Sequence, residues 1–158
     1  ISTDPAAEPL AREENLPVYE AASFAWPVDP QGVHLGDAFL KISAPDMAKI
    51  GQLMLAGGRW DEKQIVPAQW VTESTRAHVP TRGYSVGGDD YGYHWWATTA
   101  DGHDAFAAAG FGGQLIEVVP DLDLVVVISC TIPEGNVHLD ASTFRGLVNA
   151  VVAPAIAP

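Results

Sequence analysis

Three glycines lie close together in the segment Ala108–Gln114, which reads AAGFGGQ. Because glycine has no Cβ, the main chain can approach a ligand closely and leave N–H groups pointing at an oxyanion. The segment therefore predicts one wall of an acyl-transfer site. A tight turn between two strands, without chemistry, is the structural alternative, since glycine clusters are common in turns.

Length and charge exclude several classes of protein. The 158 residues, 47% of them hydrophobic, suit one domain that buries its own core. Eight Lys and Arg against 20 Asp and Glu give a net charge of −12, which repels nucleic-acid phosphates, so we expect no nucleic-acid partner. The longest apolar run, Leu124–Ile128, is far shorter than the ~20 residues of a membrane-spanning helix, and it predicts no membrane span. Nothing in the sequence indicates a compartment.

The cysteine and histidines do not form a recognisable ligand set. Cys130 is the single cysteine, which excludes an internal disulfide, and its place after a Val/Ile run favours a packed core residue. The five histidines are scattered, with no pair at the i, i+4 spacing of a helical zinc site. His103 lies in ADGHDA, where an exposed turn histidine is the simpler interpretation. We therefore predict neither a metal site nor another cofactor.

The first half of the chain predicts a connecting segment and two helices. Residues 1–25 are acidic and interrupted by proline and alanine, which indicates an exposed connection before a folded region, 26–158. In SAPD, Ser43 and Asp46 form a capping box that begins a helix, and Gly57 and Gly58 end it. Pro67 begins a second helix, and residues 79–90 have the composition of a loop.

The second half predicts an antiparallel meander. Its expected strands are Tyr91–Thr98, Ala105–Gly110, Gln114–Val119 and Leu124–Cys130, separated by turn residues. The fold class is therefore α+β, an antiparallel sheet meander flanked by helices. A closing helix capped by Asp140 should lie across the sheet through apolar side chains at i, i+3, i+4, i+7 and i+8, namely Phe144, Leu147, Val148, Val151 and Val152.

Two groups of side chains near the glycine segment have open roles. In Tyr91–Trp96, strand alternation distributes the aromatic rings over both faces of the strand. One face belongs to the core, and the other either belongs to the core too or lines a pocket. Tyr93 and Trp95 are our candidates for that wall. Gln114 either holds a substrate carbonyl or braces the glycine turn.

The order of these motifs resembles the C-terminal portion of the serine β-lactamase-like family. That family includes class C β-lactamases, penicillin-binding proteins, and related esterases and aminohexanoate-oligomer hydrolases. The resemblance covers most of residues 26–130 and implies a partial β-lactamase/transpeptidase-like fold. The matching motifs are Trp26, Asp29 and Gly32; Ser43–Gly58; Gln64–Ser74; Tyr91–Trp96; Gly110–Gln114; and Val118–Val127.

The resemblance also implies a role for each residue of the glycine segment. The family's Lys-Thr-Gly or His-x-Gly element falls on Ala108, Ala109 and Gly110, so its first position has no cation to recognise a substrate carboxylate. The backbone N–H of Phe111 would donate to the oxyanion. Ala108, Ala109 and Gly110 would line the substrate site. Gln114, Tyr93 and Trp95 join them as substrate-contact candidates from their positions in the chain, with the alternatives given above.

Two other family motifs do not occur in this sequence. No serine is followed three residues later by lysine, and no tyrosine is followed two residues later by asparagine, so the Ser-x-x-Lys and Tyr-x-Asn groups are absent. Ile1-Ser2-Thr3 resembles the end of a family segment downstream of both motifs, which predicts that the chain begins within a domain.

Two hypotheses for function follow. In the first, the chain is the C-terminal portion of a serine hydrolase that cleaves a small-molecule ester or amide through an acyl-enzyme, and it is inactive alone. Its partner would be the N-terminal catalytic segment of the same protein, and without that segment exposed apolar surface favours self-association. In the second, the chain is a non-catalytic binding or interaction module on the same fold.

Overall fold

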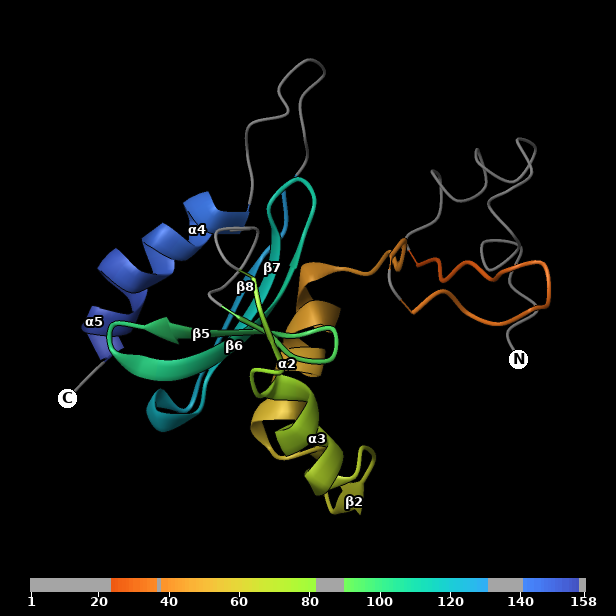
Figure 1. Ribbon diagram of the computed structural model, residues 1–158, viewed down its shortest axis with the longest axis horizontal. Coiled ribbons are helices and arrows are strands. Elements are labelled where there is room, and N and C mark those ends of the chain that lie inside the picture. The colour runs from red at the N-terminus through yellow and green to blue at the C-terminus, as the bar shows by residue number, and fades with distance from the viewer. Residues whose placement is uncertain (1–23, 37, 82–89, 131–140, 157–158) are drawn as a thin grey trace. The chain divides into compact units, whose positions relative to one another are not determined.

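The computed structural model describes residues 24–36, 38–81, 90–130 and 141–156 (Figure 1). Contacts divide the chain into two compact units, Ile1–Asp46 and Met47–Pro158. The predicted boundary between a connecting segment and a folded region at residues 25 and 26 stays a prediction. Among the described residues, no helix is both long enough and apolar enough to cross a membrane.

The first unit contains a small turn that explains the spacing of Trp26, Asp29 and Gly32. The Asp29 carboxylate accepts the N–H groups of Gln31 and Val33, each at 2.9 Å, and Gly32 has a φ of 82°. Trp26 donates its indole N–H to the carbonyl of Leu35 at 2.8 Å. Within this turn the motif therefore holds a local chain reversal together.

Helix α2, Ala44–Leu55, begins and ends as its sequence predicts. The Ser43 hydroxyl donates to Asp46 Oδ2 at 2.6 Å and accepts the Asp46 N–H at 3.3 Å, which confirms the capping box. At its end, Gly57 and Gly58 have φ values of 62° and 84°, and the Gly58 N–H donates to the Leu53 carbonyl at 2.8 Å. This is the glycine-terminated helix end expected from the sequence.

Short elements follow α2. Strands β1, Arg59–Trp60, and β2, Lys63–Gln64, form a hairpin. Helix α3, Ala68–Thr75, begins directly after Pro67, as predicted.

A six-stranded antiparallel sheet forms the centre of the second unit, with strand order β3-β4-β5-β6-β7-β8. This confirms the α+β fold of antiparallel strands flanked by helices. The predicted loop 79–90 begins and ends in strands β3 and β4, and residues 82–89 lie outside the described residues. The strands are β3, Val79–Pro80; β4, Asp90–Tyr91; β5, Trp96–Ala100; β6, His103–Gly110; β7, Gln114–Val119; and β8, Leu124–Ile128.

The prediction of one strand over Tyr91–Thr98 is wrong. The chain turns between β4 and β5, so that Tyr91 and Trp96 are cross-strand partners, and His94 has a φ of 64°. Gly92 is pressed against α3, because a Cβ there would overlap the Ser74 carbonyl oxygen. This tertiary contact and the turn override the β propensity of the aromatic run, and the expected alternation of its rings does not occur.

Helices cover both faces of the sheet. Figure 1 shows the C-terminal helical segment beside the sheet. On that face, Ala107 and Leu115 pack against Val148, which belongs to a π-helical stretch between α4 and α5. On the other face, α2 packs closely through Gly51, where a Cβ would overlap Val125 Cγ1 and lie 3.0 Å from Ile116 Cγ2. The C-terminal helical segment consists of α4, Ala141–Leu147, the π-helix Val148–Val152 and α5, Ala153–Ile156.

The predicted apolar face of the closing helix is only partly correct. Phe144, Val148 and Val152 pack against the sheet, whereas Leu147 is 51% exposed and Val151 is 56% exposed. The buried stripe therefore repeats every fourth residue and is narrower than predicted. The wider π-turn shifts the side chains, and Pro154 has no N–H to continue regular α-helical bonding. The predicted cap, Asp140, lies outside the described residues.

Candidate active site

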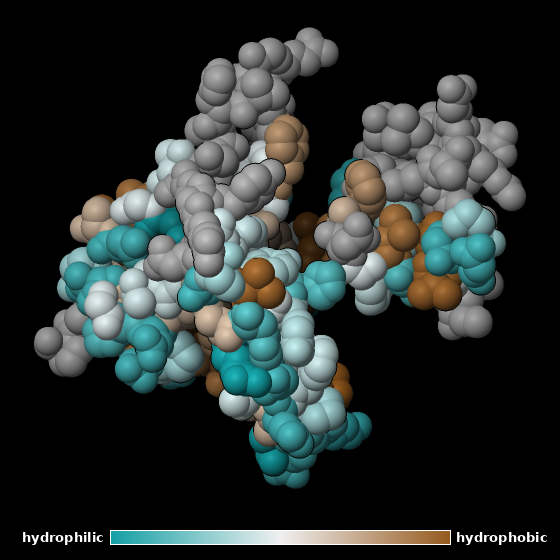
Figure 2. All heavy atoms as spheres, in the orientation of Figure 1, coloured by the Kyte–Doolittle hydropathy of each residue, from teal (hydrophilic) through white to brown (hydrophobic). Residues whose placement is uncertain are grey.

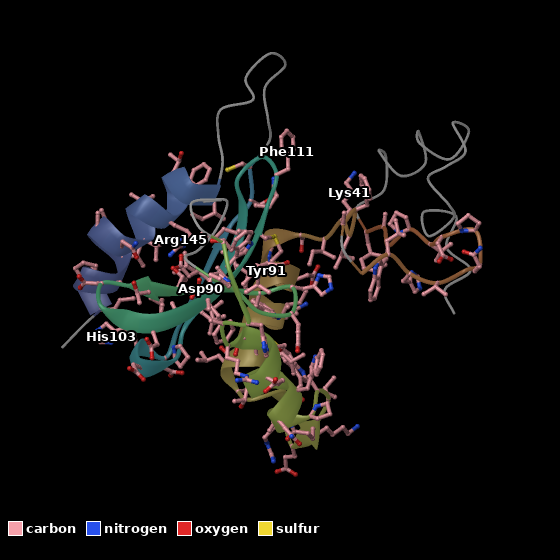
Figure 3. All side chains as sticks on the ribbon, in the orientation of Figure 1. Lys41, Asp90, Tyr91, His103, Phe111 and Arg145 are labelled. Carbon is pink, nitrogen blue, oxygen red and sulfur yellow. The ribbon has the colours of Figure 1, made fainter. Side chains whose placement is uncertain are left out.

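The glycine segment forms a three-residue turn between β6 and β7. The strand ladder ends at the pair Gly110 and Gln114, so Phe111 lies beyond the ladder. Gly112 and Gly113 have φ values of 78° and 82°, the left-handed region that favours glycine. Figure 3 shows Phe111 at the free end of this hairpin, and its side chain is 75% exposed.

The Phe111 N–H is the candidate oxyanion donor. Within the part of the chain that the structure describes, it donates to no main-chain carbonyl. An N–H that the strand ladder does not use is the kind of group that an oxyanion site requires, and this role of Phe111 stays a prediction.

The last three residues of β6, directly before the turn, are two alanines and a glycine. Ala108, Ala109 and Gly110 are half-buried and pair with β7. Ala109 belongs to the cluster under the C-terminal helical segment, and alternation places Ala108 on the opposite face of the sheet. No positive charge stands at these three positions, so this strand offers shape and main chain rather than a charged anchor.

Gln114 is bonded to the main chain of Cys130. Its Nε2 donates to the Cys130 carbonyl at 2.7 Å, and its Oε1 accepts the Cys130 N–H at 3.3 Å. These bonds tie the start of β7 to the chain just after β8. They support the bracing alternative for Gln114, and its role in substrate binding stays a prediction.

Tyr93 and Trp95 have their ring contacts elsewhere. Tyr93 stacks on His78 and Trp70, with ring centroids 4.2 Å and 5.6 Å apart, on the side of α3. Trp95 contacts the ring of Phe106 edge-on at 5.3 Å. The structure therefore groups these two residues with α3 and the middle of β6, and their assignment as pocket walls stays a prediction.

His103 lies far from the glycine turn. It begins β6 while Gly110 ends it, and seven steps of ~3.3 Å separate them by about 23 Å. Figure 3 shows His103 and Phe111 at opposite ends of the sheet. His103 Nδ1 is 3.9 Å from Asp121 Oδ2. Among the described residues, no group of three or more His, Cys, Asp or Glu side chains is placed to hold a metal ion.

A buried ion pair under α4 was not found by sequence reasoning. Glu117 in β7 is fully buried, and its Oε1 lies 3.6 Å from Arg145 Nε. Arg145, labelled in Figure 3, lies beside the sheet. It also donates to the Thr98 hydroxyl and to the Thr99 carbonyl, the latter at 3.4 Å. Burial raises the pKa of Glu117, and the charge of Arg145 opposes that rise. The available signal was a single carboxylate within the apolar strand QLIEVV.

A cavity of about 520 Å³ lies between α2, α3 and the strands β5 and β6. Its polar lining includes Thr72, Thr75, Arg76 and Asp104, and Met54, Val71 and Phe106 supply apolar lining. None of the residues predicted for the site lines this cavity. It is therefore separate from the glycine turn.

The comparisons with known proteins agree with the motifs and the fold. The family model named Beta-lactamase matches residues 2–149. This chain belongs to the β-lactamase family. A similar solved structure is a Bacillus anthracis protein named as a 6-aminohexanoate-dimer hydrolase, with a TM-score of 0.60 and 22% sequence identity. The match covers 93% of this chain and 38% of that one, and it shows a shared fold. No curated protein matched the sequence.

Proposed function

We propose that this chain is the C-terminal portion of a serine hydrolase of the β-lactamase family that cleaves an ester or amide through an acyl-enzyme. The observation that carries the proposal is the Phe111 N–H, which lies beyond the strand ladder at a glycine turn. The chain spans 38% of the similar hydrolase structure, which is consistent with a portion of a larger protein. Family membership supports a small-molecule substrate.

The proposed reaction divides the chemistry between two segments. A serine from a Ser-x-x-Lys segment attacks the acyl carbon, and its proton passes to the lysine or to the tyrosine of Tyr-x-Asn. The Phe111 N–H stabilises the oxyanion that forms. The bond to the leaving alcohol or amine then breaks, the leaving group takes up a proton, and water hydrolyses the acyl-enzyme. This chain supplies the donor and the neutral strand Ala108–Gly110, so the scissile group is bound without a charged anchor on that strand.

A pair of Phe111 variants tests the donor. In a protein that also contains the catalytic segment, Phe111→Pro removes the N–H, and Phe111→Ala keeps it while removing the exposed ring. Loss of one oxyanion donor lowers kcat about 10²–10³-fold, so Phe111→Pro should show that loss and Phe111→Ala should retain most activity. Circular dichroism and Tm confirm that both variants fold. Equal activity of the two folded variants contradicts the donor role.

A fluorophosphonate probe tests where the nucleophile lies. The isolated chain should show no stoichiometric serine labelling and no hydrolysis of a chromogenic ester. A longer protein with an upstream Ser-x-x-Lys should show both. Stoichiometric labelling of any serine in the isolated chain would overturn the proposed division of the site.

The alternative function is a non-catalytic binding or interaction module on the same fold. It is favoured by one observation, the absence of both Ser-x-x-Lys and Tyr-x-Asn from the 158 residues. The upstream reading frame discriminates the two. A Ser-x-x-Lys there supports the hydrolase, and a natural start codon near Ile1 supports the module.

A further inference from the structure

The ring of Phe144 in α4 packs directly on the main chain of the glycine turn. A Cβ placed on Gly113 would overlap Phe144 Cε2 and lie 2.8 Å from Cδ2. Both separations are too short for atoms that are not bonded to each other, so the ring fills the space that a side chain at position 113 would need. Gly113 is two residues from Phe111, the candidate donor.

Phe144 is itself held in place. Its ring packs against the buried cluster of Ala107, Leu115 and Val148. The next residue, Arg145, bonds to Thr98 and faces the buried Glu117 carboxylate. The helix segment that contacts the turn is therefore fastened to three strands of the sheet.

We propose that Phe144 is a positioning residue that holds the Phe111–Gly113 turn in the conformation that presents the Phe111 N–H. The inference rests on the proposed function, because it assigns a task to the turn that Phe111 serves. Two left-handed glycines in succession give the turn freedom to move. Oxyanion stabilisation, by contrast, requires a donor fixed about 2.7–3.1 Å from the developing charge. The Phe144 ring supplies the restriction that the turn sequence lacks.

Mobility of the turn in this chain is the first test. ¹⁵N relaxation measures backbone order parameters at Gly112 and Gly113 in the wild-type chain, in Phe144→Ala and in Leu147→Ala. Leu147 is on the same helix and is 51% exposed, so it is the matched control. We expect the glycine values to fall from about 0.85 to below about 0.6 in Phe144→Ala only. Unchanged values in Phe144→Ala, or an equal fall in Leu147→Ala, overturn the proposal.

Two glycines in the turns at the two ends of β6 provide the second test. Gly102 and Gly113 have nearly equal φ values, 83° and 82°, but a Cβ on Gly102 meets nothing within 4 Å. Gly113→Ala should therefore raise the unfolding equilibrium constant about tenfold more than Gly102→Ala, because it adds overpacking against the ring. Phe144→Leu should reduce that difference. Equal effects of the two glycine variants contradict the contact between the Phe144 ring and Gly113. This comparison does not need Phe144→Ala, so it still tests the contact if that variant fails to fold.

Kinetics of the protein that contains the catalytic segment separate this inference from the proposed function. Phe144→Ala should lower kcat by about tenfold or more with little change in KM, and Phe144→Leu should restore part of the loss. If Phe111→Pro leaves activity intact, the proposed function fails even where the mobility result holds. If Phe111→Pro is inactive and Phe144→Ala keeps full kcat, the positioning role alone fails.

Discussion

Replacing Arg145 by methionine removes the positive charge that faces the fully buried Glu117 carboxylate. Methionine keeps much of the side-chain volume, so the change mainly affects charge and hydrogen bonding. Leaving a buried charge without its partner typically costs about 3–5 kcal/mol. The Nε–Oε1 separation of 3.6 Å is long for a charge-assisted hydrogen bond, so we expect a loss of stability at the lower end of this range, about 3 kcal/mol.

Thermal and urea unfolding of the isolated chain measure this loss. For a chain of this size, about 3 kcal/mol corresponds to a fall in Tm of roughly 6–12 °C. Arg76→Met is the matched control, because Arg76 forms a shorter ion pair with Glu73, 2.6 Å, but both side chains are exposed. Solvent screens that pair, and we expect little change in Tm. The apolar double variant Glu117→Met/Arg145→Met should recover most of the stability that Arg145→Met loses.

The pH dependence follows from the raised pKa of Glu117. The folded state has the higher pKa, so protonation of this carboxyl favours folding. Its contribution is complete below the unfolded pKa and is lost as the pH rises through the folded pKa. Removing Arg145 raises the folded pKa further, so the gap in stability between Arg145→Met and the wild type should widen from acidic to neutral pH. A constant gap across that range, or equal losses for Arg145→Met and Arg76→Met, would refute the reasoning.

Three further predictions concern packing, capping and association. Gly51→Ala should destabilise the chain by about 1–3 kcal/mol in urea unfolding, because the added Cβ overlaps Val125. The control is Gly146→Ala in α4, whose added Cβ meets open space and which should be neutral or stabilising. Equal effects of the two variants contradict the close packing of α2. Ser43→Ala should cost about 1 kcal/mol through loss of the helix cap, and an unchanged urea midpoint opposes that role. The isolated chain should self-associate in sedimentation experiments, and Val151→Lys, at a position 56% exposed, should weaken that association. Unchanged association of Val151→Lys contradicts a role for the surface of the C-terminal helix.

Figure 2 bears on the expected strength of this association. Over the unit Met47–Pro158, hydrophilic and neutral residues cover most of the visible face, and hydrophobic residues appear in small separate groups. Such scattered groups are ordinary on a protein surface. We therefore expect association to be weak and concentration-dependent on this face.

Local signals predicted those elements whose ends are set by their own residues. Strand β7, Gln114–Val119, was predicted to the residue, because glycines precede it and Pro120 follows it. The cap of α2 could be predicted equally well from the local sequence, since Ser43 and Asp46 bond to each other. The glycine turn was predicted for the same reason, as its conformation requires residues without a Cβ.

Features that depend on distant residues could not be predicted in the same way. The turn at Gly92 exists because that glycine meets Ser74 of α3, a contact that the aromatic run does not encode. The pairing of Glu117 with Arg145 joins residues 28 positions apart in the sequence, across a strand and a helix. Gln114 was correctly placed beside the turn, but its partner, the main chain of Cys130, becomes visible only when β8 is paired with β7.

Stability and the geometry of the turn are coupled through one helix segment. Phe144 contacts Gly113, and its neighbour Arg145 faces Glu117, so the ring contact and the ion pair fasten the same part of α4. Arg145→Met should therefore loosen α4 and raise the mobility of Gly112 and Gly113, although Arg145 has no part in the proposed chemistry. Glu117→Met/Arg145→Met keeps the helix packed without charge, so the turn should stay ordered. If the turn responds to charge removal itself rather than to loss of helix packing, the double variant will be as mobile as the single one.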